Sequence, residues 1–257
     1  MFHFFPGKIV FTKYQVAADQ YLKRTISNER LLDFSPLYLY LNIFARKYTG
    51  NPYHFILWIQ ILLVSLAAVL LFLLLKSFFN WTLSIAGAIV FVTNKSIILY
   101  TLTMEPEPLL IFFILGFVYF GTRSIIAPTG GSFFLSGLFL GLSILTRSNF
   151  LPIALVIPIF LMIKNRDIKK WLRPVVLFGI PLLIIMSFLA FRNSSIVHSF
   201  TLIQMNPGQV FYDGNNPNSM GESAIYPPLV NDFAGQFQDQ ADFPPVVYRH
   251  FARKIKN

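Results

Sequence analysis

Residues 54–75 form the feature that most limits what this chain can fold into. They read HFILWIQILLVSLAAVLLFLLL and contain no Asp, Glu, Lys or Arg. A helix rises ~1.5 Å per residue, so a segment of this length crosses the ~30 Å hydrocarbon core of a bilayer. Five further apolar segments follow: one from residue 81, interrupted at Asn94 and Lys95, and then 108–121, 131–145, 150–163 and 171–191. The sequence therefore predicts an all-α polytopic membrane protein with about six transmembrane helices.

The composition supports this class and excludes several kinds of active site. Of the 257 residues, 55% are hydrophobic and only 12% are charged, about half the charged fraction of a soluble domain. The chain has no cysteine, which excludes disulfides, thiolate metal ligands and a cysteine nucleophile. Its four histidines are far apart, and the sequence has neither a Gly-rich phosphate loop nor a GxSxG motif. We expect no metal and no cofactor.

The net charge of +10 allows two interpretations, nucleic-acid binding or contact with anionic lipid. In membrane proteins, basic residues gather in cytoplasmic loops and meet anionic headgroups, so we expect membrane lipid and no nucleic acid as a partner. Lys76 follows the first apolar segment, Arg123 follows the third, and a strongly basic loop joins the fifth to the sixth. By alternation these three loops share one side, which the positive-inside rule makes cytoplasmic.

The opposite, external side then receives both polar ends of the chain. Residues 1–53 are predicted to form an external loop with amphipathic interfacial helices, residues 54–191 the transmembrane domain, and residues 192–257 an external polar loop region. One helix of the first region is predicted to bury an apolar face made by Val16, Leu22, Ile26 and Leu31. A second helix starts at Pro36, and its membrane-surface residues are predicted to be Leu37, Tyr40, Leu41 and Phe44.

Acidic side chains are unevenly divided between the two sides. Only Asp167 of the eleven acids falls on the cytoplasmic side. Glu105 and Glu107 lie in the turn TMEPEP directly before an apolar helix, where ionisable groups are costly and often functional. Glu107 precedes Pro108, and the helix dipole also stabilises a carboxylate at a helix start. The sequence leaves both roles open for Glu107, whereas we expect Glu105 to be an exposed neighbour.

Five short motifs follow one another along the chain: ADQY, SPLYLYLNIFARKYTGNPYHFILWIQILLVSL, LYTLTMEPEPLL, GLFLGLSILTRSNFLPIAL and FYDGNNPNSMGES. In this order they resemble the GT-C membrane glycosyltransferases, in the branch of the protein O-mannosyltransferases and the lipid A aminoarabinose transferases. The resemblance implies transfer of a sugar from a polyprenyl-phosphate-linked donor to a protein, lipid or glycan acceptor. It places this reaction on the external face of a multi-pass protein of the cell envelope, in a bacterial inner or plasma membrane.

The resemblance and the chemistry together name the candidate site residues. Asp19 matches the family's catalytic aspartate, and Glu107 is the second candidate catalytic acid. Transfer from a lipid phosphate also needs cations that stabilise the leaving phosphate. The candidates for phosphate binding are Arg147, at the external end of the fourth segment, together with Lys95 and Arg24. The sequence determines neither the sugar nor the acceptor.

Two departures from the family pattern affect how complete this chain is. The family has a membrane helix before the aspartate loop and further helices after the GNNP region, so we expect this chain to be a piece that lacks both ends or a degenerate gene product. Two other classes of function stay open. One is a polytopic transporter or channel-like protein, which would place polar residues within several spans. The other is a non-catalytic membrane assembly protein or an inactive fragment.

Overall fold

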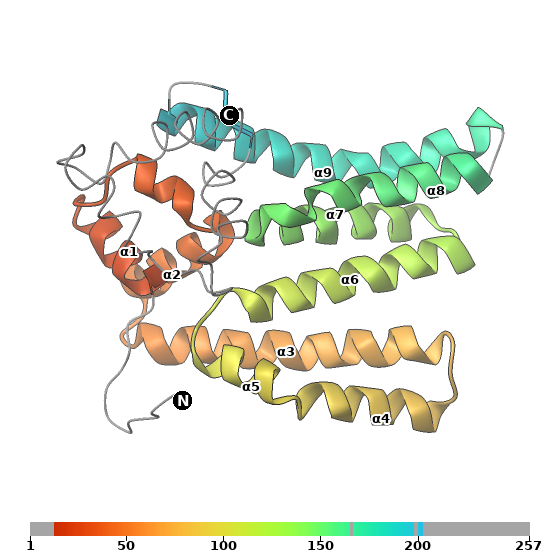
Figure 1. Cartoon of the computed structure of the whole chain (residues 1–257), viewed down its shortest axis with the longest axis horizontal. Helices are drawn as coiled ribbons and strands as arrows, with labels where there is room; N and C mark the ends of the chain where they lie inside the picture. Colours follow the sequence, from red (N-terminus) through yellow and green to blue (C-terminus); the bar gives the residue numbers. More distant parts are fainter. Residues whose placement is uncertain (1–12, 165–166, 198–199, 203–257) are drawn as a thin grey trace, which may run out of the picture.

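The computed structural model describes residues 13–164, 167–197 and 200–202. All regular elements within these residues are helical, which confirms the predicted fold class (Figure 1). The α-helices are α1 (Lys13–Leu22), α2 (Pro36–Tyr48), α3 (Pro52–Lys76), α4 (Trp81–Val92), α5 (Lys95–Leu102), α6 (Glu107–Ile126), α7 (Gly130–Thr146), α8 (Val156–Lys164) and α9 (Ile168–Val197). Two 3₁₀ helices are η1 (Glu29–Asp33) and η2 (Ser148–Leu155). The motif FYDGNNPNSMGES lies outside the described residues.

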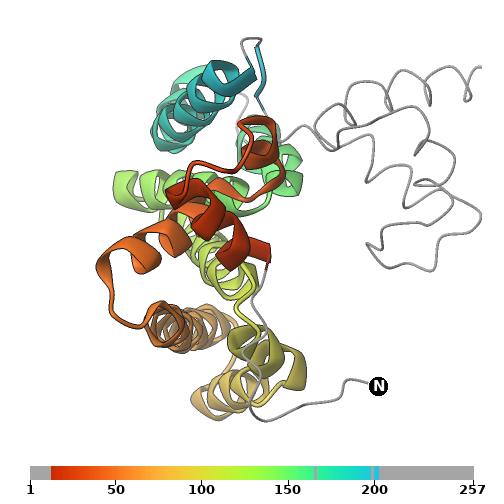
Figure 2. The ribbon, with the colours of Figure 1, turned by 90° about the vertical axis from the view of Figure 1, so that its left-hand side faces the viewer.

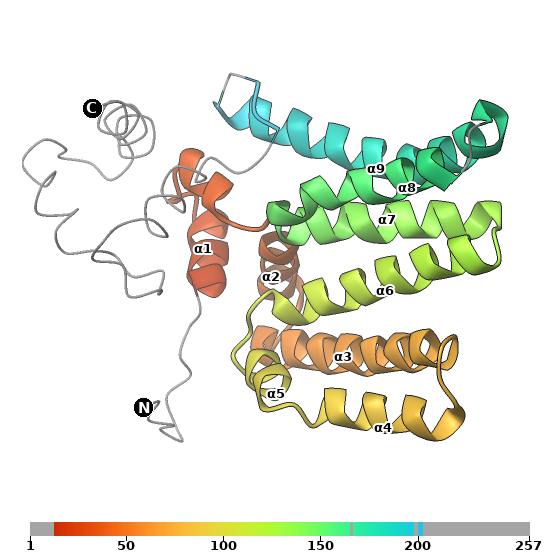
Figure 3. The same cartoon turned by 45° about the vertical axis from the view of Figure 1, so that its right-hand side comes forward.

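The apolar helices lie side by side, and the chain runs back and forth between their two ends. Neighbouring pairs are α4 with α3, α3 with α6, α6 with α7, and α7 with α9 (Figures 1 and 3). One end carries α1, α2 and the turn between α5 and α6, and we call it the α1–α2 end. The opposite end carries the α3–α4, α6–α7 and α8–α9 connections. This is the alternation of loops that the sequence predicted.

The six predicted segments are all helical, but they differ in length. Three helices, α3, α6 and α9, are each long and apolar enough to cross a membrane. α4 and α5 together form a fourth candidate span, bent by 47°, and α7 and the η2–α8 segment are shorter. The difference arises because Asn94, Arg147 and Pro152 interrupt the other apolar runs.

The long helices expose most of their apolar surface. At most 28% of the most apolar stretch of α3, α6 or α9 is buried inside the protein. A helix that is hydrophobic around its whole circumference and unburied requires a hydrocarbon environment. The outward faces of these helices are therefore the faces that meet lipid.

The first predicted amphipathic helix is shorter than expected, and its predicted face is wrong. α1 ends at Leu22, where Arg24 adopts a left-handed backbone (φ 57°). The Arg24 N–H bonds the Tyr21 carbonyl and the Thr25 N–H bonds the Gln20 carbonyl, which is a Schellman termination. Val16 and Leu22 are exposed, and the buried face is instead Tyr14, Gln15, Ala17 and Ala18. The prediction failed because it counted Ile26 and Leu31 into a helix that stops before them.

α2 begins at Pro36 as predicted and lies with α1 across the ends of the long helices (Figure 2). Tyr40 and Phe44 are exposed, as a membrane-surface position requires, whereas Leu37 and Leu41 are half-buried against the protein core. The buried face of α2 carries Tyr38, Leu39, Asn42 and Ile43. α2 therefore closes the α1–α2 end and leaves only one edge outward.

Glycines let α7 pack closely against both neighbours. A Cβ built on Gly137 would lie 1.9 Å from the Phe178 carbonyl oxygen in α9, and one on Gly116 of α6 would lie 2.1 Å from the Phe139 ring of α7. Small residues at such positions are the usual means of close helix contact in membranes. α9 also continues to Val197, beyond the predicted end of its segment at residue 191.

Candidate functional site

A buried glutamine of α3 hydrogen-bonds to the turn between α5 and α6. Gln60 of α3 is fully buried, and its Nε2 donates to the Glu105 carbonyl (2.7 Å) and to the Tyr38 hydroxyl (3.0 Å). Met104 in the same turn is buried with a left-handed backbone (φ 56°), and Gln15 of α1 donates to its sulfur (3.0 Å). Helices α1, α2 and α3 thus fix a turn that is distant from them in sequence.

Glu107 is the first residue of α6, with Pro106 at the N-cap and Pro108 following. Its carboxylate forms an ion pair with Arg147, the C-cap residue of α7. The Glu107 side chain is 17% exposed and the Arg147 side chain 48%. Arg147 uses one guanidinium nitrogen for Glu107, and about half of its side chain is exposed.

The other oxygen of Glu107 has an unusual environment. Glu107 Oε2 is buried and has no hydrogen-bond partner within the described part of the chain. A buried carboxylate oxygen without a donor is costly, so such groups are rare and call for an explanation. A hydroxyl or amide donor from a bound substrate would satisfy it.

The end of α7 that carries Arg147 is fixed to the start of α2. Ser35 is buried, and its hydroxyl lies 2.7 Å from the Thr146 carbonyl and 3.2 Å from the Leu145 carbonyl. The last carbonyls of a helix lack intrahelical partners, so this hydroxyl supplies one. The contact sets the position of Arg147 relative to α2.

Glu105 is not the exposed neighbour that the sequence predicted. It is half-buried, because the turn folds onto α1 and α2. Burial raises the pKa of the Glu105 carboxyl; Lys13 and Arg147 act in the opposite direction, and Glu107 adds to the rise. One electrostatic cluster at the α1–α2 end thus contains two acids, Glu105 and Glu107, and two cations, Arg147 and Lys13.

Two tyrosines complete the cluster. Burial raises the pKa of Tyr14 to about 12, with Glu105 and Glu107 adding to the rise and the Ser35 backbone and Arg147 opposing it. Burial also raises the pKa of Tyr38, with Glu105 again contributing. Their rings meet edge to face with centroids 4.8 Å apart. Both phenols stay neutral and act as hydrogen-bonding groups beside the acids.

Asp19 lies in α1 but in a different set of contacts. Its carboxylate pairs with Arg46 of α2 at 2.7 Å, and the Asp19 side chain is 40% exposed. Within the described residues, no hydrogen bond or ion pair joins Asp19 to Glu107 or to Arg24. The structure therefore places both predicted catalytic acids at the α1–α2 end, each with its own arginine partner.

The two remaining predicted phosphate ligands stand apart from the Glu107–Arg147 pair. Lys95 is the exposed first residue of α5, at the break after α4. Arg24 is exposed and occupies the left-handed position that ends α1. Neither forms an ion pair with a carboxylate in the part of the chain that the structure describes.

Sequence reasoning missed Arg192, which lies in the last turns of α9. It is only 9% exposed, and it donates to the Tyr40 hydroxyl (3.0 Å), the Asn193 side-chain oxygen (2.9 Å) and the Leu31 carbonyl (3.2 Å). All these acceptors are neutral, so the buried positive charge has no carboxylate partner among the described residues. The signal in the sequence was the polar pair Arg192-Asn193 at the end of an apolar run.

Metal ligands are not gathered anywhere in residues 13–164, 167–197 or 200–202. No group of three or more His, Asp or Glu side chains in these ranges is arranged to hold a metal ion. The chemical groups of the α1–α2 end are carboxylates, arginines, a lysine and phenols. Such a set can accept a proton, orient hydroxyls and neutralise a phosphate.

Comparison with known families supplies the class of protein. Residues 33–191, well over half of the chain, match the family described as dolichyl-phosphate-mannose-protein mannosyltransferase. The chain belongs to this family. As a family member it is a glycosyltransferase of the GT-C type and a multi-pass membrane protein. No curated protein and no solved structure matches the chain.

The family match covers some candidate residues and not others. Lys95, Glu107 and Arg147 lie within the matched range, whereas Asp19 and Arg24 precede it and Arg192 directly follows it. The match favours a transferase over the transporter and assembly-protein alternatives. The expected resemblance to the protein O-mannosyltransferase branch is confirmed at the level of the family.

Proposed function

We propose that this glycosyltransferase moves a sugar from a polyprenyl-phosphate-linked donor to a hydroxyl-bearing acceptor at the α1–α2 end. The observation that carries the proposal is the Glu107–Arg147 pair with its unpartnered carboxylate oxygen. Glu107 Oε2 has no donor among the described residues, and the Arg147 side chain beside it is about half exposed. A sugar phosphate supplies hydroxyl donors and a phosphate acceptor on one molecule.

In the proposed reaction a carboxylate acts as the base and a guanidinium stabilises the leaving phosphate. The acceptor oxygen attacks the anomeric carbon, the bond from that carbon to the phosphate oxygen breaks, and polyprenyl phosphate leaves with the bonding electrons. A carboxylate takes the proton of the acceptor hydroxyl. A guanidinium fork stabilises the charge that develops on the leaving phosphate.

We assign the carboxylate roles to Asp19 and Glu107. Asp19 is the base implied by the family resemblance, and Arg46 orients it. Glu107 Oε2 accepts a hydrogen bond from a hydroxyl of the sugar or of the acceptor, while Arg147 pairs with Oε1. Glu105 is a second candidate base, because burial raises its pKa toward the range in which a carboxylate accepts protons more readily.

We assign binding of the donor phosphate to cations at the same end. Arg147 is the principal candidate because its guanidinium is half-exposed beside Glu107. Arg192 is a further candidate, because it is a buried cation with no carboxylate partner among the described residues. Lys95 and Arg24 remain further candidates, each exposed and available to a headgroup.

We further propose that the α1–α2 end faces the outside of a bacterial inner or plasma membrane. The described basic residues of the opposite end are Lys76, Arg123, Lys164, Lys169, Lys170 and Arg173, and the only described acid there is Asp167. Under the positive-inside rule that end is cytoplasmic. A lipid-linked sugar presented on the external leaflet would then reach the site directly.

A transfer assay tests the proposal. Membranes that contain the protein are supplied with a polyprenyl-phosphate-linked sugar and a mixture of protein, glycan and lipid acceptors. Asp19→Asn keeps the shape of the side chain and removes the base, so transfer should fall by ~10²–10⁴-fold if Asp19 is the base. Glu105→Gln is the parallel variant for the other candidate, and Asp167→Asn at the opposite end is the matched control. Full transfer by Asp19→Asn, Glu105→Gln and Glu107→Gln alike would contradict the proposal.

A further inference from the structure

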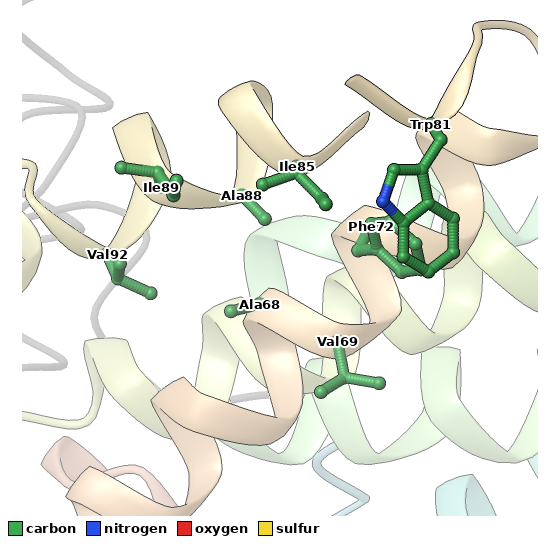
Figure 4. Close-up of a pocket in the computed structure, with 8 residues that line it drawn as sticks. All are labelled: Ala68, Val69, Phe72, Trp81, Ile85, Ala88, Ile89 and Val92. Carbon is green, nitrogen blue, oxygen red and sulfur yellow. The ribbon is translucent and has the colours of Figure 1, made fainter. Parts of the chain in front are cut away.

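The outermost helix pair, α3 and α4, encloses an apolar groove that the proposed reaction does not use. Eight side chains line it, namely Ala68, Val69, Phe72, Trp81, Ile85, Ala88, Ile89 and Val92 (Figure 4). The groove is shallow and open to the surroundings, with a volume of about 390 Å³. Its lining is entirely hydrocarbon and aromatic, which is the complement of an apolar chain.

Packing of small residues explains why the groove exists. α3 and α4 touch closely at Gly87, where an added Cβ would meet the Leu75 side chain at 2.5 Å. Ala68 and Ala88, in the middle of the groove, have no bulk with which to fill the space beside this contact (Figure 4). Val69, Ile85 and Ile89 form its margins and are well exposed.

The groove has the length and position of one leaflet. Along α4 it runs from Trp81 to Val92, which at ~1.5 Å per residue is about 16 Å, close to half of the ~30 Å hydrocarbon core. Trp81 begins α4 and Phe72 lies in the last two turns of α3, so the groove starts at the opposite end of the bundle from Glu107. The tail of a donor bound at the α1–α2 end would lie in the other leaflet.

A cation stands at the mouth of the groove. Phe72 and Trp81 meet edge to face with centroids 5.0 Å apart, and the Lys76 Nζ lies 5.1 Å from the Trp81 ring centroid. Lys76 is exposed, and the only described acid at its end of the bundle is Asp167. An anionic headgroup is the complement of this lysine, and an acyl chain is the complement of the groove below it.

We infer that the α3–α4 groove binds an acyl chain of an anionic phospholipid, with Lys76 holding the headgroup phosphate. Trp81 supports the lysine from below and forms the boundary between headgroup and chain. The site is independent of the sugar-transfer proposal, because its residues lie in the other half of the membrane. It gives the outermost pair of helices a bound lipid as a third packing partner.

Fluorescence of Trp81 tests the inference. The chain has three tryptophans, and Trp58→Phe together with Trp171→Phe leaves Trp81 alone. This variant is reconstituted in vesicles of brominated phosphatidylcholine and of brominated phosphatidylglycerol, whose bromine atoms quench a tryptophan in contact with the chains. We expect phosphatidylglycerol to bind at Trp81 about fivefold more tightly, the effect of ~1 kcal/mol from one basic residue. Equal quenching by the two lipids would overturn the inference.

Two further variants separate the lysine from the groove. Lys76→Gln should remove the preference, whereas Lys47→Gln should keep it; Lys47 also lies 5.1 Å from an aromatic ring, that of Tyr48, but at the other end of the bundle. Ala88→Phe fills the groove and leaves the lysine, and should also remove the preference. A preference that survives Ala88→Phe would show headgroup attraction alone and would overturn the acyl-chain assignment. A Trp81 that neither lipid quenches would show that another polypeptide, such as a second copy of the chain, covers the groove.

Native mass spectrometry gives an independent readout on the chain with all its tryptophans. Protein extracted in mild detergent and supplied with phosphatidylglycerol should retain one lipid, and Lys76→Gln and Ala88→Phe should each retain less. Lys47→Gln is again the matched control. Equal retention by all four proteins would contradict the inference even if the tryptophan variants failed to fold.

Discussion

Glu107 and Arg147, forty positions apart in sequence, form an ion pair across the ends of α6 and α7. Glu107 is the first residue of α6, and Arg147 is the C-cap residue of α7. The pair therefore lies at the helix ends and not on their apolar surfaces. The pair is partly exposed, so its contribution to stability is small. Glu107 Oε2, which has no donor in the part of the chain that the structure describes, suits a polar ligand.

Arg147→Lys keeps the charge and loses the fork geometry, so it separates catalysis from stability. We expect transfer from the polyprenyl-phosphate donor to fall by ~10²-fold or more, the scale of losing one fixed donor to a developing oxyanion. The unfolding temperature in detergent should change little, because exposed ion pairs contribute ~0–1 kcal/mol. Arg173→Lys, at the opposite end, is the control. A large loss of stability with unchanged transfer would assign Arg147 a structural role only.

Gln60→Leu removes the buried amide that holds the turn before α6. The Glu105 carbonyl and the Tyr38 hydroxyl each lose a donor, so we expect a cost of ~1–3 kcal/mol in the free energy of unfolding. Tyr38→Phe removes only one of the two contacts and should cost less. Denaturation in mixed micelles, followed by tryptophan fluorescence, measures both. If the two variants were equally stable, the bond to the Glu105 carbonyl would contribute nothing.

Stability should depend on pH through Glu105. Burial raises the pKa of this carboxyl above its ordinary value of 4.5, so the folded protein holds the proton more tightly than the unfolded chain. The stabilising contribution is fully present below pH 4.5 and is lost as pH rises through the folded pKa. Glu105→Gln cannot ionise, so its unfolding temperature should fall less than that of the wild type between mildly acidic and neutral pH. Parallel curves for the two proteins would contradict this assignment, and Asp167→Asn serves as the control.

The orientation of the bundle can be tested by labelling single cysteines, since the natural chain has none. Gly50→Cys lies at the α1–α2 end, in open space with no atom within 4 Å of an added Cβ, and Ser77→Cys lies in the exposed α3–α4 connection. A membrane-impermeant maleimide applied to intact cells should label Gly50→Cys and not Ser77→Cys. The reverse pattern would place the site on the cytoplasmic face.

The helices and their alternation could be predicted from the sequence because both depend on local properties. Apolar runs set the spans, and Pro36 and the basic loops mark helix starts and shared ends. The extent of α1 could not be predicted, because the residue that ends it, Arg24, is an arginine in a backbone conformation that glycine usually adopts.

The site was only partly predictable, for a different reason. Glu107 and Arg147 were each selected for their chemistry at a helix end, but their pairing depends on how α6 packs against α7. The burial of Glu105 depends on α1 and α2 covering the turn. In the sequence, Gln60 is a single polar residue within an apolar helix, and nothing there indicates its bond to the Glu105 carbonyl. Long-range packing decides such features, and a single sequence carries no direct signal of it.

The contact of Gly137 with α9 has a consequence for substrate recognition. Gly137 is about 15 Å from Arg147 along α7, and Phe178 is about 21 Å from Arg192 along α9, at ~1.5 Å per residue. A side chain at Gly137 must displace the Phe178 carbonyl, and that displacement moves one arginine relative to the other. We therefore expect the spacing of the two proposed phosphate ligands, Arg147 and Arg192, to depend on a helix contact that is far from both. Under the proposed function, we therefore expect substitution at this glycine to change which phosphate-bearing headgroup the enzyme accepts, although no residue of the proposed site is altered.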